Sequence, residues 1–177
     1  MAWSFYQLDY THAWQSTRVE GSSGCPARRS AVHVSQSIAP RLMRRNCVSV
    51  DHQSARSLAD AYTAAWNSGS PEAVAEFYSP EGQIVINRGT PWIGRKGIAE
   101  MAAGFFADVP DLALVCDDVR ASGTHVAYFW TFTGTHASTK NPLRIVGWEE
   151  WDLDEELKVV SSRGWYDADE YARQTAA

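Results

Sequence analysis

The sequence predicts an α+β domain in which a curved, cone-shaped antiparallel sheet wraps around three N-terminal helices. Between residue 51 and about residue 107, apolar residues recur at helical spacing, whereas after Pro110 apolar and polar residues alternate as they do in a strand. Turn residues such as Ser122 and Gly123 separate the alternating segments. A length of 177 residues suits one such domain with a single core.

The helical half divides into three segments. The first follows Asp51, a suitable N-cap, and places its apolar residues on one side. These residues are Leu58, Tyr62, Ala65 and Trp66. Gly69 ends this helix, and Ser70 and Pro71 are suited to the start of a short second helix. We expect its buried side to consist of Val74, Phe77 and Tyr78. A third helix is predicted from about residue 96 to residue 107.

The alternating half predicts a sheet. The expected strands are residues 84–86, 112–120, 125–135, 143–153 and 157–166. Helices packed on the concave side of this sheet would leave a cavity between the two layers. A last short helix is expected from Ala168 to Gln174, with Asp167 as its N-cap.

The formal net charge of −5 is unevenly distributed. Residues 1–50 have a net charge of +4, and residues 51–177 have a net charge of −9. We expect residues 1–50 to be a disordered basic leader, because they show neither helical period nor alternation. Two alternatives are an arm that touches an acidic surface and a natural chain that starts near Met43. Residues 51–177 are the predicted domain, and its acidity makes nucleic acid an unsuitable partner.

The number and spacing of the cysteines indicate a reducing compartment. Cys25, Cys47 and Cys116 are odd in number and lack C-x-x-C spacing, which indicates free thiols in a reducing cytoplasm. The sequence contains no run of 18 apolar residues, so no membrane-spanning helix is predicted. We therefore expect a cytoplasmic protein that does not bind a membrane.

One charged residue lies in an apolar strand register. In the strand 143–153 the odd positions are apolar or Gly except for Glu149, so alternation places this carboxyl group on the interior face. Burial of a carboxyl group raises its pKa, and a raised pKa suits a general acid or base near neutral pH. The alternative is a structural Glu149 that is satisfied by a partner such as Tyr62 or by water.

The order of these elements resembles the nuclear transport factor 2-like superfamily, whose fold is a cystatin-like roll. Within it, three segments look most like the SnoaL-like branch, which is named after polyketide cyclases. These segments are residues 77–82, 92–95 and 109–112. The resemblance covers roughly residues 52–173 and implies the cone-shaped fold, but none of these segments is a catalytic signature.

A comparison with ketosteroid isomerase, from the same superfamily, implies roles for single residues. Tyr62, in the context Tyr-x-Ala-Ala-x-Asn, falls on that family's hydrogen-bond-donating tyrosine, and Glu149 falls on its oxyanion-hole carboxylic acid. The family's proton-abstracting aspartate falls on Val85, which cannot accept a proton. Asn87, two residues further along the strand, is polar but not a base. The resemblance therefore implies that Glu149 itself moves the proton and that Tyr62 polarises a substrate oxygen.

The strand 125–135 predicts an aromatic wall. In limonene epoxide hydrolases, a related family, an Asp-Arg-Asp set falls on Trp130, Phe132 and Gly164, none of which can activate water. The even face of this strand is instead suited to a flat or polycyclic ligand. His136 shares that face if the strand continues, and it would then be a second acid or base. The residues expected to bind substrate are Trp66, Asn87, Tyr128, Trp130, Phe132 and Trp151.

These observations favour a cofactor-independent isomerase, cyclase or dehydratase that acts on a hydrophobic, carbonyl-bearing substrate. Its catalytic residues would be Glu149, Tyr62 and His136. We expect no metal and no cofactor, because ligand spacings and nucleotide-binding motifs are missing from the sequence. The alternatives are a non-catalytic module that binds a small hydrophobic ligand and a dimerisation or partner-binding domain. A homodimer would use the outer sheet face, which carries Phe129, Thr131, Val146 and Trp148.

Overall fold

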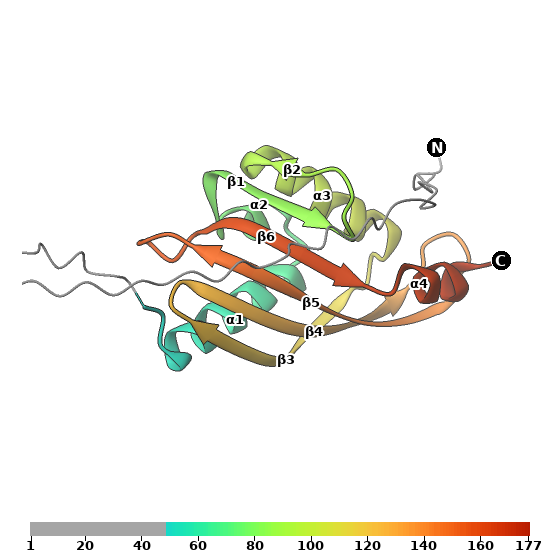
Figure 1. Cartoon of the computed structure of the whole chain (residues 1–177). Coiled ribbons are helices and arrows are strands. Elements are labelled where there is room, and N and C mark those ends of the chain that lie inside the picture. Colours follow the sequence, from blue (N-terminus) through green and yellow to red (C-terminus); the bar gives the residue numbers. More distant parts are fainter. Residues whose placement is uncertain (1–48) are drawn as a thin grey trace, which may run out of the picture. The chain divides into compact units, whose positions relative to one another are not determined.

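The computed structural model describes residues 49–177 (Figure 1). The helices of this part are α1 (His52–Asn67), α2 (Pro71–Ala75), α3 (Gly94–Asp108) and α4 (Ala168–Thr175). The strands are β1 (Tyr78–Ile86), β2 (Trp92–Ile93), β3 (Ala113–Ser122), β4 (His125–Thr135), β5 (Pro142–Leu153) and β6 (Val159–Tyr166). The predicted leader lies outside the described residues except for its end. Val50 already belongs to the domain, since it is buried and its N–H donates to the Gly123 carbonyl oxygen at 2.8 Å.

The six strands form one sheet in the order β2-β1-β6-β5-β4-β3. The four strands β3 to β6 form the antiparallel meander that the alternating half predicted. The expectation of a wholly antiparallel sheet was wrong at one place, because β1 runs parallel to β6. After β2 the chain crosses through α3 to the far edge of the sheet, and three reversals then bring β6 back beside β1 in the same direction.

The helix starts follow the predicted caps. Asp51 Oδ1 accepts from the Ser54 N–H at 2.7 Å, and Ser70 Oγ accepts from the Ala73 N–H at 3.2 Å. The second helix is shorter than expected, because it ends at Ala75 and Tyr78 already opens β1. The reason is pairing with β6, in which the Phe77 carbonyl oxygen accepts from the Val159 N–H at 2.9 Å.

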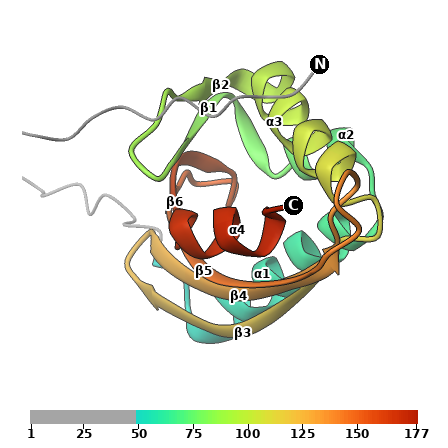
Figure 2. The same cartoon turned by 90° about the vertical axis from the view of Figure 1, so that its right-hand side faces the viewer.

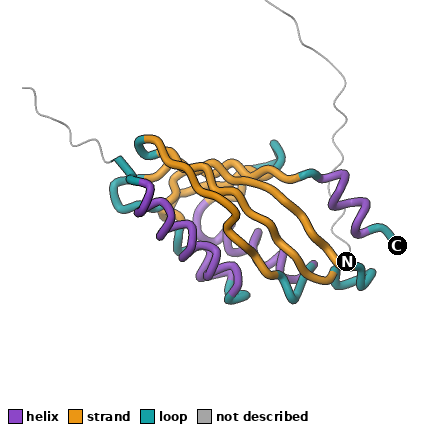
Figure 3. Tube along the Cα trace, turned by 90° about the horizontal axis from the view of Figure 1, so that it is seen from below, coloured by secondary structure: helices purple, strands orange, loops and turns teal. Residues whose placement is uncertain are grey.

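Helices α1 and α3 pack on the concave face of the sheet, α1 on β3 and α3 on β1. Figure 2 shows the strands curving around this layer, and Figure 3 shows α1 lying along one face of the sheet. Helix α4 follows β6 at one end of the sheet, where the Gln174 side chain bonds to the backbone of Arg144. Among residues 49–177, no helix is long and apolar enough to span a bilayer.

Strands β4 and β5 are paired without interruption from His125 opposite Asp152 to Thr135 opposite Pro142. In the middle of this ladder Trp130 lies opposite Gly147. A Cβ atom built on Gly147 would lie 2.5 Å from two ring carbons of Trp130 and would also collide with the Trp165 carbonyl oxygen. Glycine at this position therefore lets the Trp130 ring lie flat across β5.

Gly147→Ala tests this packing. We expect a loss of about 1–3 kcal/mol in the free energy of unfolding, because neither backbone nor an indole ring can move aside at low cost. The measurement is urea denaturation followed by circular dichroism. Gly104→Ala in α3 is the matched control, since its Cβ would meet nothing within 4 Å. It should raise stability by roughly 0.5–1 kcal/mol. Equal stability of Gly147→Ala and the wild type would contradict the packing.

Candidate active site

A cavity of about 50 Å³ lies between the helices and the sheet. Its inner wall is formed by buried residues, including Trp66 on α1, Met101 on α3 and Trp130 on β4. Half-buried residues surround its outer end, namely Ile86, Phe105, Leu112 and Tyr166. Trp165 also borders the cavity, although its ring stacks on Trp148 at the outer sheet face. One water molecule needs about 10–15 Å³ of such volume, so the cavity has room for several water-sized groups. It therefore suits a small molecule better than a polycyclic one.

Glu149 is the acidic residue of the cavity wall. It lies on the inner face of β5, opposite Gly164 of β6, and only 7% of its surface is exposed. The predicted burial of this carboxyl group is therefore confirmed. A Cβ at Gly164 would be 3.6 Å from Glu149 Cγ, so the missing side chain leaves open space directly beside the glutamate.

One carboxyl oxygen of Glu149 accepts hydrogen bonds from three side chains, which come from three different elements. Oε2 accepts from Trp151 Nε1 at 2.8 Å, from Ser162 Oγ at 3.1 Å and, weakly, from Tyr62 Oη at 3.5 Å. Within residues 49–177 none of the hydrogen bonds goes to Oε1. Oε1 is therefore the oxygen that remains for a ligand.

Burial raises the pKa of Glu149 above its ordinary value of 4.5. The hydrogen bonds from Trp151, Ser162 and Tyr62 favour the charged form and lower the pKa, but they offset desolvation only in part. Burial and the nearby Glu149 charge likewise raise the pKa of Tyr62 and of Tyr78, so both phenols keep their protons. The cluster thus combines a carboxyl group that can titrate toward neutral pH with donors that cannot.

Three of the residues expected to bind substrate line the cavity. Trp66 approaches from α1, whereas Trp130 and Phe132 form the β4 wall with their rings stacked at 6.0 Å between centroids. The resemblance placed the epoxide hydrolase triad on Trp130, Phe132 and Gly164. All three residues line the cavity, and they hold no group that activates water.

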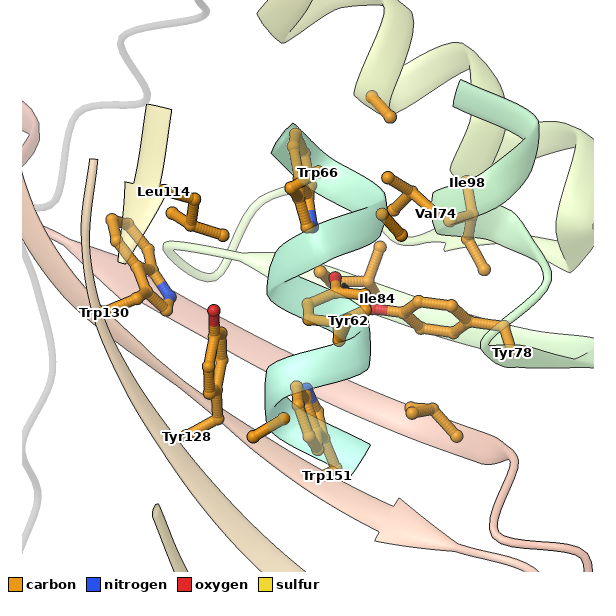
Figure 4. Packing of buried hydrophobic residues seen from close by; sticks show 14 of the residues in the cluster. Tyr62, Trp66, Val74, Tyr78, Ile84, Ile98, Leu114, Tyr128, Trp130 and Trp151 are labelled. Atoms are coloured by element: carbon orange, nitrogen blue, oxygen red, sulfur yellow. Dashed lines mark hydrogen bonds between the residues drawn. The ribbon is translucent and has the colours of Figure 1, made fainter. Parts of the chain in front are cut away.

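Tyr128, Trp151 and Tyr62 are more deeply buried, and their side chains lie close together between α1 and the sheet (Figure 4). The Tyr128 and Trp151 rings stack at 4.9 Å, and the Tyr62 ring meets both edge-on. Tyr128 Oη bonds to Thr63 Oγ1 at 2.7 Å. None of the three aromatic residues lines the cavity, so Trp151 and Tyr62 act on Glu149 from behind rather than on a ligand.

Asn87 and His136 lie outside the cavity. Strand β1 ends at Ile86, and Asn87, with φ of 48°, turns away and accepts from the Tyr166 N–H at 3.0 Å. Strand β4 ends at Thr135, so His136 enters the following turn, where its Nδ1 lies 2.8 Å from Thr139 Oγ1. The expectation that these two side chains continue the inner strand faces was wrong. Strand β4 stops one residue before His136, and Asn87 has the parity of Val85, whose partner Arg163 lies on the other face of the sheet.

The inner face of β1 is apolar. Ile84 lies opposite Ser162 and Ile86 opposite Gly164, and both isoleucines line the cavity. Val85, on which the resemblance placed the aspartate of ketosteroid isomerase, lies opposite Arg163 on the other face. Strand β1 therefore contributes no proton-accepting group to the cavity.

Several site residues were missed by sequence reasoning. Ser162, the second donor to Glu149, shares the parity of Gly164 on β6, and this alternation could have identified it. Met101 and Phe105 lie four residues apart on α3, and such helical spacing indicates burial but not contact with a cavity. In the described residues 49–177, no three His, Cys, Asp or Glu side chains are grouped to hold a metal ion.

The chain belongs to the SnoaL-like domain family, whose pattern its residues 59–162 match. No match was found among curated proteins. The likeness to solved structures extends over the domain at low sequence identity, so it bears on the fold alone.

Three solved structures illustrate this likeness. A hypothetical protein with a ketosteroid isomerase-like fold from Catenulispora acidiphila, in complex with trimethylamine, is 19% identical with a TM-score of 0.62 over 67% of this chain and 91% of that chain. TsrD from Streptomyces laurentii is 19% identical with a TM-score of 0.62 over 71% and 96%. The epoxide hydrolase/cyclase-like enzyme SalBIII, from pyran ring formation in salinomycin, is 18% identical with a TM-score of 0.61 over 68% and 95%.

The raised pKa of Glu149 predicts how stability depends on pH. The folded protein holds this proton more tightly than the unfolded chain, so the stabilisation is present below pH 4.5 and is lost as pH rises through the folded pKa. Glu149→Gln cannot ionise. We therefore expect the unfolding temperature of the wild type to fall relative to that of Glu149→Gln over this window, measured by calorimetry at a series of pH values.

Ser162→Ala sharpens the same experiment. The substitution removes a donor that favours the charged form of Glu149, so the pKa of Glu149 should rise further. The fall in unfolding temperature should therefore extend to higher pH in Ser162→Ala than in the wild type. A difference between wild type and Glu149→Gln that stays constant from about pH 4 to pH 8 would show that the carboxyl pKa is ordinary.

Proposed function

We propose that this protein is a cofactor-independent enzyme that moves a proton on a small carbonyl compound, with Glu149 as the acid and base. The observation that carries the proposal is the asymmetric carboxyl group of Glu149, which lines an apolar cavity: Oε2 is held by three donors, while Oε1 accepts no hydrogen bond from residues 49–177. Membership of the SnoaL-like family and the likeness to an epoxide hydrolase/cyclase-like enzyme support it.

The chemistry follows from the group that is present. The Glu149 carboxylate takes a proton from the carbon next to a carbonyl group, the C–H electron pair moves into the enolate, and the carboxylic acid then returns the proton to carbon. Net isomerisation results when the proton returns to a different carbon. Because burial raises the pKa of Glu149, its conjugate base is stronger than an exposed carboxylate.

Tyr62 has a different role in this proposal from the one that the resemblance implied. Its hydroxyl group contacts Glu149 Oε2 and Tyr78 Oη and does not line the cavity. We therefore assign Tyr62, together with Trp151 and Ser162, as a positioning residue that fixes the carboxyl rotamer. His136 has no part in the proposed chemistry, because it lies in the turn after β4.

Hydrogen–deuterium exchange tests this proposal. The protein is incubated in D₂O with cyclopentanone, cyclohexanone or acetophenone, and loss of the proton signal next to the carbonyl is followed by NMR. We expect exchange that Glu149→Gln slows by about 10²–10⁴-fold, the usual contribution of one acid–base group. Glu150→Gln is the matched control, because this neighbour points to the other face and pairs with Arg163; it should leave the rate unchanged.

The non-catalytic alternative makes the opposite prediction. A binding module would bind these ketones without exchanging their protons, and Glu149→Gln would change only the affinity for the ketones. Ketone binding with no exchange above the protein-free rate would therefore overturn the enzyme proposal and favour a small-molecule binding module.

We also propose a homodimer through the outer sheet face. Val115 and Val146, which are 58% and 55% exposed, flank Thr131 across three strands, and beside them Phe129, Trp148 and Trp165 form a second row. Acidic and basic side chains border these rows, such as the pair Glu150 and Arg163. A second copy related by a twofold axis would cover the apolar rows and offer complementary charges at their border.

Sedimentation velocity tests the dimer. We expect twice the mass of one chain for the wild type and at least a tenfold weaker dimer for Val146→Lys, because the substitution buries an unpaired charge. Ile93→Lys is the control, since Ile93 is 59% exposed but lies on β2, away from these rows. A monomeric wild type, or equal effects of both substitutions, would refute this interface.

A further inference from the structure

Tyr166, the last residue of β6, lines the outer end of the cavity and is half-buried there. Among the cavity-lining residues in the described part of the chain, it alone carries a hydroxyl group. Within residues 49–177 the side-chain nitrogen and oxygen atoms that are both covered by protein and unpartnered are Nε1 of Trp66 and Nε1 of Trp130. The Tyr166 hydroxyl group makes no hydrogen bond in this range either, but it is not covered. It is therefore an accessible donor, whereas the two indole N–H groups are closed off by protein.

The sheet register places Tyr166 diagonally across from Glu149. Glu149 of β5 lies opposite Gly164 of β6. Two positions further along each strand, and on the same face, Gly147 lies opposite Tyr166. The Trp130 ring covers Gly147, but the space beside Gly164 is open. Diagonal neighbours in a sheet are about 7–8 Å apart, so a molecule of a few heavy atoms above Gly164 would contact both groups.

Two contacts fix the position of Tyr166. Asn87 continues the pairing of β1 with β6, because its N–H donates to the Gly164 carbonyl oxygen at 2.9 Å and its Oδ1 accepts from the Tyr166 N–H at 3.0 Å. The ring of Tyr171 on α4 meets the Tyr166 ring edge-on, with the centroids 5.8 Å apart. Since backbone and ring are both held before a ligand arrives, binding costs less ordering entropy.

The charge state of Tyr166 suits a neutral ligand. Burial raises the pKa of Tyr166 above its ordinary value of 10, and the nearby carboxylate of Asp108, the last residue of α3, raises it further. The phenol therefore keeps its proton at neutral pH. The described residues that line the cavity include no Lys, Arg or His. A ligand carboxylate would thus meet Glu149 and Asp108 without a cation to offset them, and a neutral molecule with an acceptor oxygen avoids this repulsion.

The proposed reaction needs a donor at the carbonyl oxygen. Negative charge develops on this oxygen when Glu149 removes a proton from the neighbouring carbon, and a hydrogen-bond donor placed there lowers the barrier. Tyr62, on which the resemblance placed this role, does not line the cavity. Tyr166 is accessible, keeps its proton and lies across Gly164 from Glu149, so it meets the requirements of this donor.

We propose that Tyr166 is a catalytic, specificity-determining residue of this cavity, whose hydroxyl group donates a hydrogen bond to the carbonyl oxygen of small neutral ketones or aldehydes. The inference rests on the proposed function, because it concerns the same reaction. The ligand lies above Gly164 with its oxygen toward the outer end and its acidic C–H group toward Glu149. Tyr166 keeps its own proton throughout, since the transferred proton moves between the ligand carbon and Glu149.

Tyr166→Phe tests this role, because it removes the hydroxyl oxygen and keeps the ring. The probe is cyclopentanone labelled with ¹³C at the carbonyl group, and its bound resonance is obtained by NMR titration of the full chain. A carbonyl resonance moves downfield when its oxygen accepts a hydrogen bond. We therefore expect the bound resonance to lie further upfield in Tyr166→Phe than in the wild type.

Tyr171→Phe is the matched control. Tyr171 is also a half-buried phenol whose pKa is raised by burial and by Asp108, but it does not line the cavity. Removal of its hydroxyl group should leave the bound carbonyl resonance at the wild-type position.

Affinity and rate give two further measurements. Tyr166→Phe should weaken cyclopentanone binding about fivefold and leave unchanged the binding of methylenecyclopentane, in which a CH₂ group replaces the oxygen. Cyclopentanecarboxylate should bind the wild type at least about tenfold more weakly than the ketone. The same variant should slow Glu149-dependent hydrogen exchange by about 10²-fold, mainly through kcat, because the hydrogen bond strengthens as charge develops on the oxygen.

A measurement on the wild type decides the question if Tyr166→Phe does not fold. Tyrosine is labelled with ¹³C at the carbon that bears the hydroxyl group. Cyclopentanone should move one tyrosine resonance that is still present in Tyr171→Phe, and methylenecyclopentane should leave this resonance in place. If the ketone and the hydrocarbon affect the tyrosine resonances equally, the inference is wrong.

The outcomes separate this inference from the proposed function. An unchanged carbonyl resonance in Tyr166→Phe, an equal change in Tyr171→Phe, tighter binding of the carboxylate than of the ketone, or no ketone binding up to about 50 mM would each overturn the inference. Glu149-dependent exchange that Tyr166→Phe does not slow would also overturn it, but would uphold the enzyme proposal. The expected resonance change without exchange would uphold Tyr166 as the donor to the ligand and reject the enzyme proposal.

Discussion

A carboxyl group in the apolar layer between helices and sheet must receive hydrogen bonds, and the core around Glu149 meets that requirement. The three donors to Glu149 come from α1, β5 and β6, so the bonds join the helical layer to the centre of the sheet. Tyr128 and Trp151 surround the cluster with stacked rings and exclude water. The same exclusion raises the carboxyl pKa, which links the packing of the core to the chemistry of the cavity.

The space beside Glu149 exists because side chains are missing. Gly164 leaves room next to the glutamate, and Gly147 allows the Trp130 ring to lie flat on the neighbouring strand. A larger residue at Gly164 would occupy this space, whereas one at Gly147 would collide with the Trp130 ring and the Trp165 carbonyl oxygen. The apolar face of β1, with Ile84 and Ile86, closes the remaining side without adding a second titratable group.

Sequence reasoning predicted which face a strand residue occupies better than where along the domain it lies. Alternation placed Glu149 inside, and the predicted strand 125–135 has the bounds of β4. Tyr128 and Trp130 share one face, but only Trp130 lines the cavity, because helix α1 covers Tyr128, whose hydroxyl group bonds to Thr63. The local pattern carries no information about this difference, since it depends on where α1 packs on the sheet.

The ends of strands were the second source of error. His136 follows the last residue of β4, and a one-residue difference in strand length removes its side chain from the inner face. Asn87 has the parity of Val85, which lies on the other face of β1. The partners of Glu149 were also only partly predictable. Tyr62 followed from the family resemblance, whereas Ser162 lies 13 positions along the chain and became a neighbour only through the β5–β6 register.

The position of one carboxyl group on one wall has a stereochemical consequence for the proposed reaction. Glu149 reaches a bound molecule only from the β5 side, and the opposite walls carry indole and aliphatic groups that do not exchange protons with carbon. Removal and return of hydrogen would thus occur on a single face of the planar intermediate. Such suprafacial transfer would carry part of an isotopic label from the donor carbon to the acceptor carbon and would give a product of one handedness.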